Sequence, residues 1–322
     1  MRKNALINSC YVCAAGAFGA FFRWLQNQSA FDAESGLVQS SALNILVPLV
    51  IIAAAVLFYF LVKKIKSKNY DVPTDIFSVF CGTSILYPVS YYAIAFVTCL
   101  GGIITMFAVS EDSFSTVYRV IALLAVLCGL GFPVICSSRR KRYAPPIICA
   151  FMTVPIVMFC VWLIACYKVN SSNPTIWAFA IEVITICICI LAFYYNAGFA
   201  FGKPSPYKAL YISMLGAFMC ITTLADTRYF GMQLIYLGAA GMLVTESWLI
   251  ISNMRKLPET AESEKSEAKK QPEKPAAEPE KVIEPGAKQD SPEPTIQAPE
   301  RKSKAATDDV AELLDECKKY LD

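Results

Sequence analysis

The sequence predicts an all-α fold: a polytopic transmembrane helix bundle of about eight spans, followed by a disordered cytosolic tail. Three observations support this fold class. The chain is strongly apolar, it contains eight apolar stretches that are long enough to cross a bilayer, and the loops between these stretches alternate between basic and non-basic. Together they divide the chain into a transmembrane domain at 1–254 and a polar tail that ends in a short amphipathic helix.

The composition of the 322 residues is uneven along the chain. Hydrophobic residues make up 56% and charged residues 17%, against the roughly 25% charged residues that are usual in soluble domains. Residues 255–322 contain 13 Lys or Arg and 17 Asp or Glu, a net charge of −4, whereas residues 1–254 have a net charge of +7. The total of +3 therefore combines an apolar, basic segment with a polar, weakly acidic one.

Eight stretches within residues 1–254 are apolar over the roughly 20 residues that a helix needs to cross the bilayer core. Arg23 and Trp24 close the first stretch like an interfacial anchor, which favours a membrane span over a cleavable signal peptide. The predicted spans cover residues 5–24, 42–62, 84–108, 115–137, 144–167, 175–200, 207–225 and 230–253.

The charges in the loops between these spans predict the orientation of the chain. Cytoplasmic loops collect Lys and Arg, and basic and non-basic loops alternate along the whole domain. A missed or invented span would place two basic loops in succession, so the alternation supports eight spans with the N-terminus and the C-terminus both in the cytosol. The basic positions on the predicted cytosolic side include Arg2, Lys3, Lys63, Lys64, Lys66, Lys68, Arg139, Arg140, Lys141, Arg142, Lys203, Lys208, Arg255 and Lys256.

The third span is preceded by more apolar sequence than one crossing requires. Residues 76–109 are apolar and contain Pro88. A kinked or tilted helix could use the excess length. We favour an interfacial helix over residues 74–83, followed by the span at 84–108.

The residue types argue against several kinds of chemistry. The chain has no His, which removes Ser-His-Asp triads and most zinc catalysis, and it has no Walker A, nucleophile-elbow or HExxH sequence. Most of the thirteen cysteines lie in apolar runs, where Cys acts as a small apolar side chain, so we expect no structural disulfides. We expect no catalytic residues, no metal site, no cofactor and no nucleic-acid partner, and an intramembrane enzyme is the least favoured class.

Glu182 is the first candidate for an intramembrane polar site. Ionisable side chains inside a span are costly and therefore point to a function. Thr185 and Asn196 share a helix face with Glu182, in a polar or small stripe that runs the depth of the sixth span. The stripe predicts either a site for a cation, a proton or a substrate, or a hydrogen-bonded contact that only joins helices.

Glu246 is the second acidic candidate, about two turns from the inner end of the eighth span. A small-residue face that includes Gly231, Gly238 and Gly241 lies nearby, and such faces are typical of close helix packing. Packing, with Glu246 directed toward the cytosolic interface, is the simpler interpretation of this span.

Basic residues near the outer ends of the spans offer possible partners for these acids. Arg119 either pairs with Glu182, since both lie in the outer half of the bilayer, or extends to the headgroups. Asp226 and Arg228 flank one residue in a tight external turn, where we predict a local ion pair.

The tail has two predicted parts. Residues 255–304 are rich in Pro, Glu and Lys and lack the apolar surface that would offset chain ordering, so they are expected to form a disordered tether. Residues 305–322 have one apolar stripe on an acidic helix. A helix this short is marginal alone in water, which indicates a docking surface for a cytosolic protein. The candidate docking residues are Val310, Leu313, Leu314, Cys317 and Leu321.

Two functions remain open from the sequence. The first is a transporter or channel-like protein for a small solute or ion, with Glu182 as its polar core. The second is a membrane scaffold or signalling subunit that recruits a cytosolic partner through residues 305–322. In both cases we expect an integral protein of the cell membrane whose lipid contacts cover residues 1–254, and the sequence leaves its oligomeric state open.

Overall fold

The computed structural model of the protein describes residues 2–29, 42–68, 70–73, 76–80, 86–109, 115–141, 145–170 and 176–256. Contacts divide the chain into two units, Met1–Ala268 and Lys269–Asp322, and every described residue belongs to the first. The predicted docking helix at 305–322 and all but the first two residues of the predicted tether lie outside the described residues.

The described residues are almost entirely helical. Every helix except the short α3 and the 3-10 turn η1 is long and apolar enough to cross a membrane, which confirms the predicted all-α fold with eight apolar helices. In chain order the elements are α1 (Arg2–Ser29), α2 (Leu43–Lys66), β1 (Tyr70–Asp71), α3 (Ile76–Val79), α4 (Leu86–Ala108), α5 (Ser115–Lys141), α6 (Pro145–Asn170), α7 (Ile176–Ala200), α8 (Pro206–Thr222), η1 (Thr223–Ala225), α9 (Phe230–Asn253) and β2 (Arg255–Lys256).

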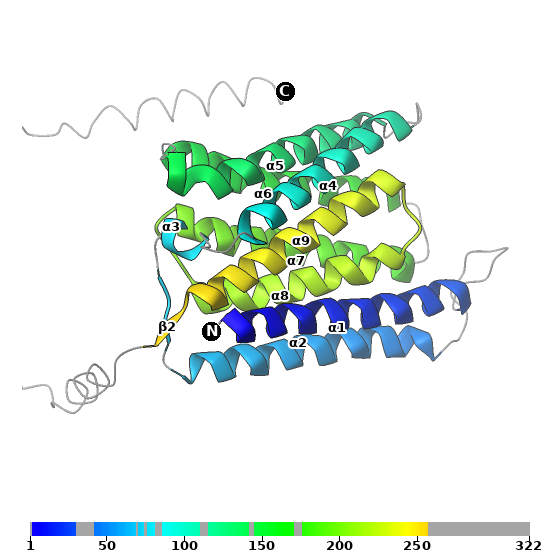
Figure 1. Ribbon diagram of the computed structural model, residues 1–322. Coiled ribbons are helices and arrows are strands. Elements are labelled where there is room, and N and C mark those ends of the chain that lie inside the picture. Colours follow the sequence, from blue (N-terminus) through cyan, green and yellow to red (C-terminus); the bar gives the residue numbers. More distant parts are fainter. Residues whose placement is uncertain are drawn as a thin grey trace, which may run out of the picture. The chain divides into compact units, whose positions relative to one another are not determined.

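Helices α4 to α9 pack as a closed ring. Each contacts the next one along the chain, and α9 returns to contact α4. Helices α1 and α2 lie outside this ring, where both contact α8 and α1 also contacts α9. Figure 1 shows α1 and α2 side by side along one edge, and the axes of the long helices are roughly aligned with one another. The end of the bundle where α1 begins and α9 ends is called the terminal end here, and the opposite end the distal end.

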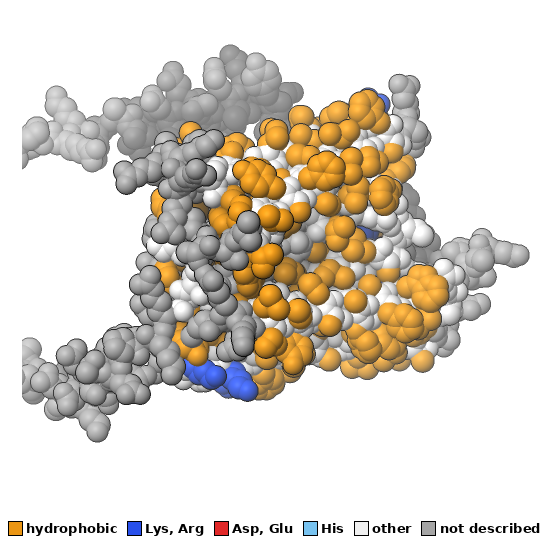
Figure 2. Space-filling view, in the orientation of Figure 1, with side chains coloured by type: hydrophobic (Ala, Val, Ile, Leu, Met, Phe, Trp, Pro, Cys, Tyr) orange, Lys and Arg blue, Asp and Glu red, His pale blue; other side chains and the backbone are white. Residues whose placement is uncertain are grey.

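The outer surface of the bundle is apolar. Phe96 and Phe107 on α4 are among its many exposed large hydrophobic side chains, and Figure 2 shows such side chains over most of one face, with a basic patch near the end of α2. Soluble proteins rarely expose continuous apolar surface on this scale, whereas lipid tails solvate it. The most buried spans are α8 and α9.

The segment after α2 folds across the terminal end. There β1 pairs antiparallel with β2, and the Tyr207 hydroxyl donates to the Tyr70 carbonyl at 3.2 Å. The Asn253 amide donates to the Val79 carbonyl at 2.6 Å, which attaches α3 to the end of α9. Helix α3 falls within the stretch 74–83, for which the sequence predicts a separate helix ahead of the third span.

Helices α4 and α9 approach each other closely because glycines lie at their contact. A Cβ atom on Gly101 would lie 2.8 Å from the carbonyl oxygen of Gly231, and Gly238 faces the side chain of Thr98. Small residues allow the backbones of membrane helices to approach. The glycines of α9 that the sequence marks as a packing face therefore contact α4.

We expect Gly101→Leu to destabilise the protein by about 1–3 kcal/mol, because the added side chain would meet backbone atoms of α9 that have no room to move. Unfolding midpoints in mild detergent measure this change. Ala93→Leu on the exposed side of the same helix is the matched control and should change stability by less than about 0.5 kcal/mol. Equal midpoints for both variants would contradict close packing of α4 on α9.

Candidate functional site

Four charged side chains form a network at the distal end. The Arg23 Nε atom lies 2.6 Å from Asp226 Oδ1, and Arg228 Nη2 lies 2.8 Å from Asp226 Oδ2. The Arg228 Nε atom lies 3.3 Å from Glu182 Oε1. Side-chain exposure runs from 2% for Arg23 to 14% for Glu182, so all four charges are largely removed from water. Two cations face two anions, and the network is balanced in charge.

Polar side chains around this network join it to further helices. Arg23 Nη1 donates to Gln26 at 2.7 Å, and Gln26 donates to Asn44 of α2 at 3.0 Å. Asn27 donates to the Ala225 carbonyl at 3.1 Å. The network and these bonds therefore connect α1, α2 and α7 with the turn between η1 and α9.

Aromatic side chains fill the middle of the helix ring. Trp162 and Phe159 of α6, Phe193 of α7 and Tyr236 of α9 are all buried, and the ring centroids of Trp162 and Tyr236 are 4.5 Å apart. Two contacts connect this aromatic plug to the charge network. Trp162 donates to Glu182 Oε1 at 3.2 Å, and the Arg228 guanidinium lies over the Tyr236 ring at 5.1 Å.

A second polar cluster lies nearer the terminal end, where α7, α8 and α9 meet. Asn196 of α7 donates its amide to Glu246 Oε2 of α9 and, at 3.0 Å, to Ser213 of α8. All three side chains are buried. Glu246 lies seven residues before the end of α9, which places it about 10 Å along the helix from the terminal end. We call these three residues the polar core.

Glu246 differs from Glu182 in having an uncompensated carboxyl group. Its Oε1 atom is buried and has no hydrogen-bond partner among the described residues. No Lys or Arg of the described segments lies within ion-pair distance of Glu246. A buried carboxylate without a cation or a full set of donors is costly. This carboxyl group can therefore accept a proton or a cation, and the neighbouring Asn196 and Ser213 oxygens are of the kind that hard cations prefer.

The remaining predicted residues have other environments. The Thr185 hydroxyl donates to the Ile181 carbonyl of its own helix at 2.7 Å, which makes it a helix-internal contact. Arg119 is exposed on α5, and the cation at Glu182 is Arg228. Glu246 is buried, and its described contact is Asn196 rather than the membrane interface. The docking residues Val310, Leu313, Leu314, Cys317 and Leu321 lie outside the described residues.

The stripe predicted along α7 thus contributes to two separate clusters, Glu182 to the charge network and Asn196 to the polar core. The local pair of Asp226 and Arg228 is confirmed. The sequence analysis did not connect Arg23 with this pair of residues. It also did not identify Ser213 as part of the polar core. The signal available in the sequence was a single arginine at the end of an apolar run, which does not identify its partner.

Eight apolar helices that enclose buried polar clusters define this chain as a multi-pass α-helical integral membrane protein. No family model, curated protein or solved structure matches it. The function is therefore inferred from the chemistry of the two clusters.

We expect Arg23→Gln and Asp226→Asn, each made alone, to destabilise the protein by about 3–5 kcal/mol, because each removes one ion pair and leaves the largely buried network with unequal numbers of positive and negative charges. The double variant restores the charge balance, with Arg228 and Glu182 still paired, and should cost less than the sum by about 0.5–3 kcal/mol. Unfolding in mixed detergent micelles measures all three.

Arg119→Gln is the matched control for this cycle, since it removes one arginine from an exposed position of α5. Its effect should stay within about 0.5 kcal/mol. Additive costs for Arg23→Gln and Asp226→Asn would show that these two side chains do not interact.

Proposed function

We propose that this protein is a transporter or channel-like protein for protons or a small monovalent cation, with Glu246, Asn196 and Ser213 as its polar core. This proposal keeps the transport function that the sequence favours. It moves the central acidic residue from Glu182 to Glu246, because the charge of Glu182 is already compensated by Arg228.

The unpartnered Oε1 atom of Glu246 is the observation that supports this proposal. Leaving an ionised carboxylate inside an apolar bundle costs free energy that packing alone does not return. A bound proton or cation removes that cost. Ionisable side chains that face the interior of membrane bundles characteristically mark ion pathways and proton relays.

The position of the polar core also suits transport. It lies about 10 Å from the terminal end, which is cytosolic in the orientation that the loop charges predict. The aromatic plug begins next to the polar core and extends away from it to the charge network, which lies at the distal end. In this arrangement the core is closed from the distal side, and movement of the helices that carry the plug would expose it there, as alternating access requires.

Glu182 has a supporting role in this proposal. Its carboxylate accepts from Trp162 and pairs with Arg228, so it holds the plug and the charge network together. A residue that is fixed by two partners from two other segments is better suited to closing the distal side than to binding and releasing an ion.

Proteoliposomes that contain the full chain test the proposal. We expect a pH gradient or a Na⁺ gradient, imposed with a membrane potential, to drive faster ion movement than in protein-free liposomes. Trapped pH-sensitive and Na⁺-sensitive dyes measure this movement. Glu246→Gln keeps the size of the side chain but removes its charge, and it should reduce the flux to the protein-free level.

Ser247→Ala is the matched control, because Ser247 is the buried neighbour of Glu246 and its hydroxyl, among the described residues, donates to the Leu243 carbonyl of its own helix. It should retain the flux, and so should a chain that lacks residues 257–322. If the chain that lacks the tail lost its flux while Glu246→Gln kept its flux, the result would overturn the proposal in favour of a scaffold. Ion movement no faster than in empty liposomes, for both H⁺ and Na⁺, would also overturn it.

A further inference from the structure

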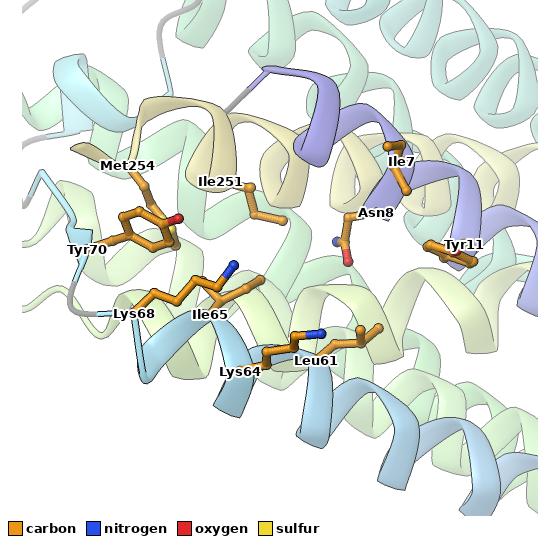
Figure 3. A pocket seen from close by; sticks show the side chains of 10 residues that line it. All are labelled: Ile7, Asn8, Tyr11, Leu61, Lys64, Ile65, Lys68, Tyr70, Ile251 and Met254. Atoms are coloured by element: carbon orange, nitrogen blue, oxygen red, sulfur yellow. The ribbon is translucent and has the colours of Figure 1, made fainter. Parts of the chain in front are cut away.

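A cavity of about 280 Å³ lies at the terminal end between α1, α2 and α9. Figure 3 shows its lining side chains, which come from these three helices, from the turn after α2 and from β1. Four lining positions of the α2 side, Leu61, Lys64, Ile65 and Lys68, follow the spacing that places residues on one helix face. This cavity is separate from the polar core and is independent of the proposed function.

The lining is divided into an apolar part and a basic part. Ile7 and Tyr11 of α1, with Leu61 and Ile251, form apolar walls, whereas Lys64 lies in the last turn of α2 and Lys68 in the turn that follows it. Figure 3 shows the Lys68 ammonium group extending along the cavity. The lining includes no Asp or Glu, so its formal charge is positive.

The two lysines are available to a ligand. Both are exposed, and neither lies within ion-pair distance of an acidic side chain among the described residues. Ile7 and Tyr11 are also exposed, at 49% and 59%, and they lie on the apolar outer surface that faces the bilayer. The cavity is therefore open on the apolar outer surface, at the end of the bundle where we expect lipid headgroups to meet the acyl chains.

We propose that this cavity binds one anionic phospholipid, with its phosphate at Lys64 and Lys68 and the start of an acyl chain against Ile7, Tyr11 and Leu61. Charge complementarity supports a lipid with net negative charge, and the apolar walls support an amphiphile over a small water-soluble anion. Basic pockets between membrane helices on the cytoplasmic side characteristically bind the headgroups of acidic lipids. The predicted orientation places this cavity on that side.

Titration of the delipidated full chain with defined lipids, followed by native mass spectrometry, tests the proposal. Phosphatidylglycerol is the probe, phosphatidylcholine is its neutral counterpart, and glycerol phosphate represents the headgroup without acyl chains. We expect one phosphatidylglycerol to bind in preference to phosphatidylcholine. Lys64→Gln with Lys68→Gln should reduce the affinity for phosphatidylglycerol about 30-fold, since each lysine near a membrane surface contributes about fivefold in affinity.

Lys63→Gln with Lys66→Gln is the matched control, because it removes the same charge from the same helix end at positions that do not line the cavity. It should leave the binding within about twofold of the original. Equal losses for the two double variants would overturn the proposal, since they would indicate a diffuse surface field rather than a site.

A filling variant tests the apolar half of the site separately. Leu61→Trp leaves both lysines in place but occupies the cavity, and it should lower phosphatidylglycerol occupancy while the unfolding midpoint is unchanged. Full occupancy in this variant would overturn the proposal. Competition by glycerol phosphate at the affinity of the intact lipid would also overturn it, because it would identify a small-anion site instead.

Discussion

The pairing of buried charges at the distal end is the interaction on which the arrangement of the helices depends. Arg23 comes from α1, Glu182 from α7, and Asp226 and Arg228 from the turn before α9. None of these charges can be left alone in an apolar environment without a large desolvation cost. Since the apolar faces of membrane helices gain little from packing on one another rather than on lipid, this charge balance is what selects one placement of α1 against the ring.

Glu182 and Glu246 carry the same side chain in the same bundle but have different neighbours. Glu182 has a guanidinium and an indole N–H, which compensate its charge and fix its position. Glu246 has one amide donor and a bare oxygen. The first set of contacts removes the reason to bind a ligand, and the second leaves that reason in place. Residue type alone therefore locates acidic sites in a membrane protein but does not assign their roles.

The eight spans could be predicted because a span depends on length and hydropathy, which are local properties of the sequence. The pairing of polar residues could be predicted only over short distances. Asp226 and Arg228 are two positions apart, whereas Arg23 is 203 positions from Asp226, and nothing local connects them. In α7 the sequence spacing predicts one polar face for Glu182 and Asn196, but the ring of helices places different neighbours at the two depths. The partner of each residue is a property of the packing.

Helix α9 connects the two proposed sites. Glu246 belongs to the polar core, and Ile251 and Met254 line the cavity near the end of the same helix. A lipid in the cavity shifts the equilibrium between two states of the bundle only if it binds one of them better. Because β2 pairs with β1 and α3 is bonded to Asn253, the end of α9 is held in place by contacts that a rearrangement of α9 would have to break. An acidic lipid seated between α1, α2 and α9 adds to those contacts, so under the proposed transport function it would favour the present arrangement of α9 and oppose the movements that transport requires.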